Sequence, residues 1–348
     1  MKKIKIGDFI FEKNSKPFIV GEVGVNHNGE LKKAFQMIEE AKKIGLNAIK
    51  FQTFKAKEFC GDPSQTYTYK SQGKEITEPM IEMFSRYEFA NDEWGKIKEK
   101  CNSEGITFLS TPQNYSDLEL LLKLGIDAIK VGSDDLTNLP LLKKYSSTNL
   151  PIILSSGMST LDEISDALNT VGFFDGYPTI LLVTTSQYPT PNKDVNLLKF
   201  HTLTEQFPDL PLGFSDHTIG NTAASIACGM GSIFFEKHFT LDCNSNGPDH
   251  WFSANPEQLK KWKNSIITSF EMLGSPEVKP TENEIANKNE FRRYIVAKKS
   301  IMLGDLFSNE NLELKRISGG NGLTGQMFEK LLNMKSNKNY KKGEKIQF

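Results

Sequence analysis

The chain has 348 residues, of which 38% are hydrophobic and 24% are charged, and its formal net charge is −1. This composition is typical of a soluble globular enzyme and excludes a disordered or fibrous chain, and the near-neutral charge argues against nucleic acid as a partner. No apolar run is long enough to cross a bilayer and the N-terminus has no signal-peptide core, so we expect a cytoplasmic protein without membrane contact.

Eight short β-branched apolar runs follow one another through the first three quarters of the chain. An opening segment, residues 4–11 with 17–19 around Asn14-Ser15, has a hairpin-like pattern that would close the bottom of a barrel. Helical patterns separate the runs, for example at 31–44 and 116–124, each closed by a glycine. Strand and helix alternating eight times predicts an α/β fold of the (β/α)8 TIM-barrel type. An open doubly wound sheet is the alternative, but no GxGxxG follows the first run. The runs are residues 18–24, 47–53, 106–112, 128–133, 151–157, 179–185, 210–217 and 232–240.

The pattern changes after the eighth run. Residues 273–290 are rich in Pro, Glu and Asn with little periodicity, which is typical of a linker. We therefore predict a barrel domain at 1–280, a linker at 281–290 and a small module at 291–348. The module has 12 basic and 5 acidic residues, against 30 and 38 in residues 1–290, so we expect it to dock electrostatically on an acidic barrel, either its own or a partner's.

Polar residues end nearly every apolar run, and the active site of a barrel lies at these carboxyl ends. Period-two alternation puts Lys50 and Gln52 on one face of their strand, and Glu236 and His238 on one face of theirs. The candidate residues at the strand ends are Glu22, Lys50, Gln52, Thr111, Lys130, Ser133, Asp134, Asp135, Ser155, Ser186, Tyr188, Ser215, His217, Glu236 and His238.

Lys50 and Lys130 face the same pocket together with hydroxyls from four strands. Lysines supply charge and hydroxyls supply directional hydrogen bonds, so this set indicates a pocket for a small polyanion such as a phosphorylated carboxylate. The alternative reading is that each lysine is a solvated strand-end residue. A buried unpaired lysine costs several kcal/mol, however, so two in barrel-facing register need a ligand or a carboxylate.

His217 and His238 end two strands that are neighbours in a barrel. They can converge on one divalent ion, with substrate or water in the remaining positions, as an open catalytic site requires. Imidazole with oxygen ligands is compatible with Mn, Mg, Co or Zn. Glu22 and either Asp135 or Asp134 are the candidate general base and acid. Ordinary hydrogen-bonded histidines, and carboxylates that only balance the lysines, are the alternatives.

Seven motifs in this order resemble the sialic acid synthase family, the bacterial enzymes that make nonulosonic acids. The resemblance covers nearly the whole chain, and its tail resembles the antifreeze-like (SAF) domain of that family at residues 297–304 and 314–316. The motifs are Gly21-Glu-Val-Gly-Val-Asn-His-Asn-Gly29, Lys50-Phe-Gln-Thr53, Ser110-Thr-Pro112, Lys130-Val-Gly-Ser133, Gly213-Phe-Ser-Asp-His-Thr218, Glu236-Lys-His-Phe-Thr240 and Gly247-Pro-Asp249.

The resemblance implies condensation of phosphoenolpyruvate with an open-chain N-acetylated hexosamine and release of phosphate. It implies a divalent metal, Mn or Mg with Co possible, on His217 and His238, and Glu22 orienting the water that attacks C2. It also implies a domain-exchanged homodimer in which Arg316 of one subunit contacts the sugar in the other. The residues implied for phosphoenolpyruvate are Lys50, Thr111, Lys130, Ser133, Ser155, Ser186 and Ser215, and those for the sugar are Gln52, Tyr188 and Asp249.

Several positions depart from the family pattern. Ser186 replaces a common asparagine, Asp134-Asp135 replaces Gly-Glu, Gln113 stands where an aromatic residue is common, and His250 follows Gly-Pro-Asp. We expect Gln113 and His250 to lie where sugar selectivity is set.

The expected activity is N-acetylneuraminate synthase acting on N-acetylmannosamine. Its alternative is N,N'-diacetyllegionaminate synthase acting on 2,4-diacetamido-2,4,6-trideoxymannose. Another metal-dependent aldolase, or a sugar-binding protein on an inactivated barrel, would leave either the tail or the charged pocket unexplained.

Overall fold

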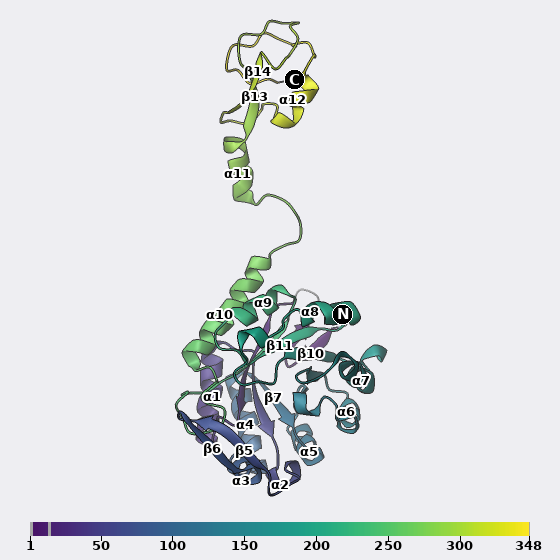
Figure 1. The fold of residues 1–348 in the computed structure, drawn as a ribbon, viewed down its shortest axis with the longest axis vertical. Coiled ribbons are helices and arrows are strands. Elements are labelled where there is room, and N and C mark those ends of the chain that lie inside the picture. Colours follow the sequence, from purple (N-terminus) through teal and green to yellow (C-terminus); the bar gives the residue numbers. More distant parts are fainter. Residues whose placement is uncertain (1–2, 13–14, 348) are drawn as a thin grey trace. The chain divides into compact units, whose positions relative to one another are not determined.

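The computed structural model describes residues 3–12 and 15–347 and divides into two compact units, 1–274 and 275–348 (Figure 1). The first unit contains a closed barrel of eight parallel strands, each hydrogen-bonded to the next in chain order, and β12 closes onto β3. This confirms the (β/α)8 fold predicted from the sequence. The strands are β3 (Phe18–Gly24), β4 (Ala48–Thr53), β7 (Thr107–Pro112), β8 (Ile129–Val131), β9 (Ile152–Ser155), β10 (Thr179–Thr184), β11 (Leu212–Asp216) and β12 (Phe234–His238).

Helices follow the strands, and their apolar residues face the barrel. In α1 (Leu31–Ile44), Met37, Ile38 and Ala41 are buried on one face, and Gly45 ends the helix with a positive φ of 83°. This left-handed position favours glycine, which explains the predicted helix end. The other main helices of the first unit are α4 (Asn91–Glu104), α5 (Tyr115–Lys123), α6 (Leu139–Ser146), α7 (Leu161–Val171), α8 (Lys199–Gln206), α9 (Thr222–Gly229) and α10 (Pro256–Leu273).

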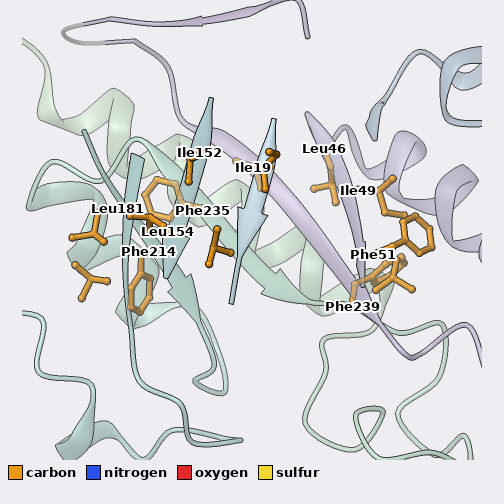
Figure 2. Packing of buried hydrophobic residues seen from close by; sticks show 14 of the residues in the cluster. Ile19, Leu46, Ile49, Phe51, Ile152, Leu154, Leu181, Phe214, Phe235 and Phe239 are labelled. Carbon is orange, nitrogen blue, oxygen red and sulfur yellow. The ribbon is translucent and has the colours of Figure 1, made fainter. Parts of the chain in front are cut away.

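Alternate residues of each strand serve two different cores. Outward-facing residues such as Ile49, Phe214 and Phe235 pack in the layer between strands and helices (Figure 2). Inward-facing residues near the strands' amino ends, such as Phe18 and Ile180, form a second apolar cluster inside the barrel. The next inward positions along the strands are polar, so the same alternation that fills the barrel floor also builds the site above it.

The N-terminal hairpin lies at the barrel floor, as predicted, but its turn is in a different place. Strand β1 (Ile4–Ile6) pairs with β2 (Phe9–Phe11) around Gly7-Asp8, and residues 13 and 14 of the expected turn lie outside the described residues. Gly7 has a φ of 57°, which the tight turn requires. Ile4, Ile6 and Phe11 join the inner apolar cluster and so cover the bottom of the barrel.

An insertion between β4 and α4 was not predicted. It contains α2 (Ala56–Phe59), the hairpin strands β5 (Thr66–Ser71) and β6 (Lys74–Pro79), and α3 (Met80–Ser85). The hairpin turns at Gln72-Gly73, where both residues have positive φ, the geometry that matches the twist of paired strands. Because it follows the carboxyl end of β4, this insertion belongs to the side of the barrel where the site lies.

The second unit has its own small core. Strands β13 (Arg293–Ala297) and β14 (Leu312–Arg316) pair antiparallel, and Ile295, Phe307 and Tyr340 are among its buried residues. It also contains the short helix α12 (Phe328–Leu331). The predicted linker at 281–290 is instead mostly helical, because α11 (Glu282–Phe291) begins at a capping box formed by Thr281 and Glu284. No helix of the described chain is long and apolar enough to cross a membrane.

Candidate active site

A cavity of about 550 Å³ lies at the carboxyl ends of the barrel strands. It collects most of the candidate residues predicted from the sequence, since successive strands place their inward-facing polar residues at the same level. The predicted residues that line it are Glu22, Lys50, Gln52, Thr111, Lys130, Ser133, Asp134, Ser155, Ser186, Tyr188, Ser215, His217, Glu236 and His238.

Two lysines and two glutamates form a buried ionic cluster on the floor of this cavity. Lys50 Nζ lies 2.8 Å from Glu22 Oε2, and both lysines lie 3.7 Å from Glu236 Oε1. All four side chains are nearly inaccessible to solvent. Glu236 is therefore the shared counter-ion of Lys50 and Lys130, a role that its position two residues before His238 indicated only indirectly. These buried charges stabilise one another, because removal of one side chain would leave its partner as an uncompensated buried charge.

Burial and ion pairing shift the pKa values of these groups in different directions. Burial raises the pKa of Glu22 to about 7, because the loss of hydration outweighs its attraction to Lys50. Burial lowers the pKa of Lys130 to about 8. Burial also acts to lower the pKa of Lys50, but Glu22 and Glu236 outweigh it and the pKa is raised. For Glu236, burial acts to raise the pKa, but the attraction of Lys130 and Lys50 outweighs burial and the pKa is lowered. Glu22 can thus exchange a proton near neutral pH.

Hydroxyl groups surround the lysines. Lys130 Nζ donates to Ser155 Oγ at 2.7 Å, and Lys50 Nζ lies 3.5 Å from Thr111 Oγ1. The backbone N–H of Gly157 donates to Ser133 Oγ at 3.0 Å, and a side chain at Gly157 would collide with that hydroxyl and with Ser186 Oγ. The structure therefore gathers cationic groups and hydroxyls on one side of the cavity, as a phosphorylated anion requires.

The imidazoles of His217 and His238 lie side by side, with ring centroids 5.5 Å apart. His217 Nδ1 donates to the carbonyl oxygen of Thr185 at 2.8 Å, which leaves Nε2 as an unprotonated acceptor facing the cavity. His238 Nδ1 is buried and has no hydrogen-bond partner among the described residues. Burial lowers the pKa of His217 to about 4 and that of His238 well below its usual range.

These two neutral imidazoles fit a divalent metal ion, because a metal needs unprotonated nitrogen ligands. No three His, Cys, Asp or Glu side chains in the described ranges group closely enough to form a larger ligand set. A metal bound here would thus take its other ligands from substrate or water, which is the open coordination of a catalytic site.

Asp249 lies in an adjoining cavity of about 190 Å³ that shares Gln52, Tyr188 and His238 with the first. Burial raises the pKa of its carboxyl group to about 7, although a hydrogen bond from the backbone N–H of Val25 acts to lower this pKa. Gly24, at a bulge in β3, has a φ of 53°. A Cβ there would lie 3.0 Å from Asp249 Oδ2, so glycine is needed for the approach of this carboxyl group.

Asp134 and Asp135, although adjacent in the chain, have different surroundings. Asp134 lines the cavity, whereas the Asp135 carboxylate accepts a hydrogen bond from Asn138 and is not part of the lining. Strand β8 ends at Val131 and residues 133–135 form a 3-10 turn, so these two neighbouring side chains differ in their surroundings, and the role of Asp135 as an acid stays a prediction. Arg316 lies on β14 of the second unit, where its guanidinium is 5.7 Å from the ring centre of Phe291. Its role toward the sugar stays a prediction.

Aromatic residues that were not predicted from the sequence also line the cavity. Phe54, Phe59 and Phe84 contact one another with ring centroids 5.1 to 6.4 Å apart, and all three line the cavity. Tyr67 of the hairpin lines both cavities. The signal that could have located them is the Gln72-Gly73 turn between two alternating segments, which predicts a hairpin after the second barrel strand.

Hydrogen bonds connect the loop that carries Asp249 to the β5–β6 hairpin and to the loop after β3. Ser71 Oγ at the end of β5 donates to Asn246 Oδ1 at 2.8 Å and accepts from the N–H of Gly247 at 3.1 Å. His250 is buried and lines neither cavity; it lies 2.6 Å from Thr240 Oγ1 and 2.9 Å from Asn28 Oδ1. His250 therefore connects the loops after β3 and β12, and it is next to Asp249 in the sequence.

Known proteins resemble this chain over most of its length. A family model described as the NeuB family matches residues 37–278. A protein of Methanocaldococcus jannaschii that carries no assigned function is 39% identical over 96% of this chain and 94% of its own. The N,N'-diacetyllegionaminic acid synthase of Campylobacter jejuni is 38% identical over 95% of this chain and 99% of its own. The crystal structure of N-acetylneuraminic acid (sialic acid) synthetase from Leptospira borgpetersenii in complex with citrate is 30% identical, covers 83% of this chain and 96% of that chain, and has a TM-score of 0.74.

Proposed function

The chain belongs to the NeuB family and is a nonulosonic acid synthase, and we propose that it condenses phosphoenolpyruvate with 2,4-diacetamido-2,4,6-trideoxymannose. The observation that supports this best is the buried cluster of Lys50, Lys130, Glu22 and Glu236 beside two neutral imidazoles. Such a cluster is costly to build in a barrel core unless ligands complete it.

Phosphoenolpyruvate is proposed to bind over the lysines. Its carboxylate and phosphate would accept hydrogen bonds from Lys50, Lys130 and the surrounding hydroxyls, which are already aimed into the cavity. Binding would also give the two buried lysines anionic partners in addition to Glu236. The residues proposed for this anion are Lys50, Thr111, Lys130, Ser133, Ser155, Ser186 and Ser215.

The carbon–carbon bond forms between C3 of phosphoenolpyruvate and the aldehyde carbon of the open-chain sugar. His217 and His238 are the residues that would hold a divalent ion, which when bound polarises the aldehyde oxygen. Gln52, Tyr188 and Asp249 are proposed to orient the sugar, because they line the side of the site next to the imidazoles. With a pKa of about 7, Asp249 can also be present as the acid that protonates the new alkoxide.

Bond formation leaves positive charge at C2, and a water molecule must add there. Glu22 is proposed to take a proton from this water, since its pKa of about 7 suits a general base near neutral pH. The resulting tetrahedral carbon expels phosphate, and a 2-keto acid is formed. Lys50, 2.8 Å from Glu22, balances the charge of the base while it is ionised.

The identity of the sugar rests on the outer wall of the cavity. Phe54, Phe59, Phe84, Tyr67 and Met158 line it, and such a wall suits acetyl methyls and a deoxygenated C6 better than a run of hydroxyl groups. The Campylobacter relative is named for the diacetyl product. N-acetylmannosamine, the substrate of the N-acetylneuraminate synthase expected first, is the second candidate.

The second unit is proposed to be an SAF domain that completes the site of a partner subunit. Its basic charge opposes the acidic charge of the barrel domain. In this arrangement Arg316 would contact the sugar across a domain-exchanged homodimer, so sugar affinity, but not phosphoenolpyruvate affinity, would depend on dimer formation.

The experiment that tests the proposal is phosphate release from phosphoenolpyruvate after EDTA treatment and addition of Mn, with each of the two sugars. Release that is lost on metal removal and restored by Mn supports the reaction, and the sugar with the higher kcat/KM identifies the substrate. Absence of phosphate release with both sugars would contradict the proposal. Pyruvate consumption in its place would favour the aldolase alternative.

A further inference from the structure

The side chain of Gln113 continues the inward-facing series of β7. Leu109 belongs to the apolar barrel floor, Thr111 faces Lys50, and Gln113 lines the cavity. Its backbone N–H donates to the carbonyl oxygen of Thr53 at 3.0 Å, so the β7 edge still follows β4 at this point. Two residues of extended chain span about 6.6 Å. Gln113 therefore lies one level farther out than Thr111, above the proposed phosphoenolpyruvate site.

The carboxamide oxygen of Gln113 is buried and has no hydrogen-bond partner in the part of the chain that the structure describes. An unpaired buried acceptor is unfavourable, and such groups in folded proteins are rare unless a ligand or water satisfies them. No packing role explains it, because Gln113 lines the cavity and is only partly buried as a residue. The free acceptor therefore points to a hydrogen-bond donor on the substrate.

The surroundings of Gln113 define what kind of donor fits. Phe54 follows directly on Thr53, the residue that Gln113 bonds, and it contacts the rings of Phe59 and Phe84. We call these three rings the aromatic wall. An unpaired acceptor that lines the same cavity as an apolar wall matches an acetamido group, whose N–H donates one directional bond while its methyl packs on the rings.

We propose that Gln113 and the aromatic wall form the subsite that recognises the second acetamido group of the sugar, and so select a diacetamido substrate over N-acetylmannosamine. This inference rests on the proposed function and adds the residues that set its sugar specificity. A hydroxyl in the same place can rotate toward another acceptor or toward water, whereas an amide N–H is fixed in direction. Losing the acceptor therefore penalises the acetamido group more strongly.

The test is Gln113→Leu, assayed for phosphate release with both sugars at saturating phosphoenolpyruvate. We expect kcat/KM for the diacetamido sugar to fall roughly 10- to 100-fold, since the buried N–H loses its partner. The value for N-acetylmannosamine should change less than about threefold, and KM for phosphoenolpyruvate should not change. Gln113→Glu keeps an oxygen acceptor and should recover most of the lost activity.

Gln206→Leu, on the exposed end of α8, is the matched control and should leave both sugars unaffected. Equal losses with both sugars, or no loss with either, would overturn the inference while wild-type activity kept the proposed function intact. Wild-type activity restricted to N-acetylmannosamine would also overturn it. A wild-type protein that releases no phosphate with either sugar would instead contradict the proposed function itself.

Discussion

At the scale of single residues, His238 presents a buried Nδ1 next to His217; this nitrogen has no hydrogen-bond partner among the described residues, and Asp249 Oδ2 lies 3.9 Å from it. We predict that His238→Ala lowers Mn-dependent turnover by roughly 100-fold or more. Loss of a residue that only hydrogen-bonds to a metal ligand lowers activity about 10- to 100-fold, and loss of a ligand itself should lower it further. Metal content after desalting, measured by mass spectrometry, should fall in parallel. His201→Ala, on an exposed face of α8, is the control; wild-type metal retention in the His238 variant would remove it as a ligand.

Gly24 provides a second prediction at this scale. In Gly24→Ala the left-handed backbone costs about 1–2 kcal/mol, and the new methyl lies 3.0 Å from Asp249 Oδ2. We expect a lower Tm and a sugar kcat/KM reduced about tenfold or more. Gly125→Ala separates the two effects, since Gly125 has a φ of 70° and no atom within 4 Å of an added Cβ. That control should lose stability alone, and equal kinetic losses in both variants would show that Gly24 acts through stability.

Alternation along the strands explains how far individual site residues could be predicted. Lys50, Gln52, Glu236 and His238 share the inward face because side chains in a strand point to opposite sides in turn. Alternation could not decide between Asp134 and Asp135, because the backbone leaves the strand before both of them. Nothing in the sequence pattern gave the unsatisfied oxygen of Gln113, since that depends on which groups the folded chain brings near it.

At the scale of elements, Ser71 fastens the β5–β6 hairpin to the loop that carries Asp249. We predict that Ser71→Ala raises KM for the sugar about three- to tenfold, because it removes two hydrogen bonds that fix this loop. KM for phosphoenolpyruvate should stay within twofold. Thr68→Ala is the matched control, since Thr68 bonds only across the hairpin to Thr77 in the interactions described here. A Ser71 variant with wild-type sugar KM would show that the hairpin does not shape the sugar site.

The elements themselves were predictable to different degrees. All eight barrel strands lie within the predicted runs, because buried parallel strands are continuous apolar segments bounded by turns. The hairpin insertion was missed because its strands are largely exposed and polar. Helix α11 was missed for a related reason: it has no buried residue and therefore no apolar period, and only its capping box marks its start.

At the scale of the whole molecule, the second unit has a core of its own. We predict that deleting residues 275–348 leaves a folded barrel whose sugar KM is raised at least about tenfold, because Arg316 and any exchanged contact are lost with it. Thermal unfolding would confirm the fold of the truncated protein, and sedimentation would report its oligomeric state. Full-length Arg316→Ala is the companion variant. Wild-type sugar KM in both proteins would exclude a role of this unit at the site.

The β5–β6 hairpin is connected to the rest of the first unit differently from the barrel strands. The floor of the barrel and the ionic cluster share strands, so a change in strand length would shift every inward-facing residue at once. The hairpin instead joins the barrel through loops, and the side-chain bonds described between it and the Asp249 loop come from Ser71 and Gln72. Among the described residues, no ion pair or side-chain hydrogen bond joins residues 66–79 to Lys50, Lys130, His217 or His238. We therefore expect sequence changes in this hairpin to alter the rim of the cavity, where Tyr67 lies, before they alter the groups carried by the barrel strands.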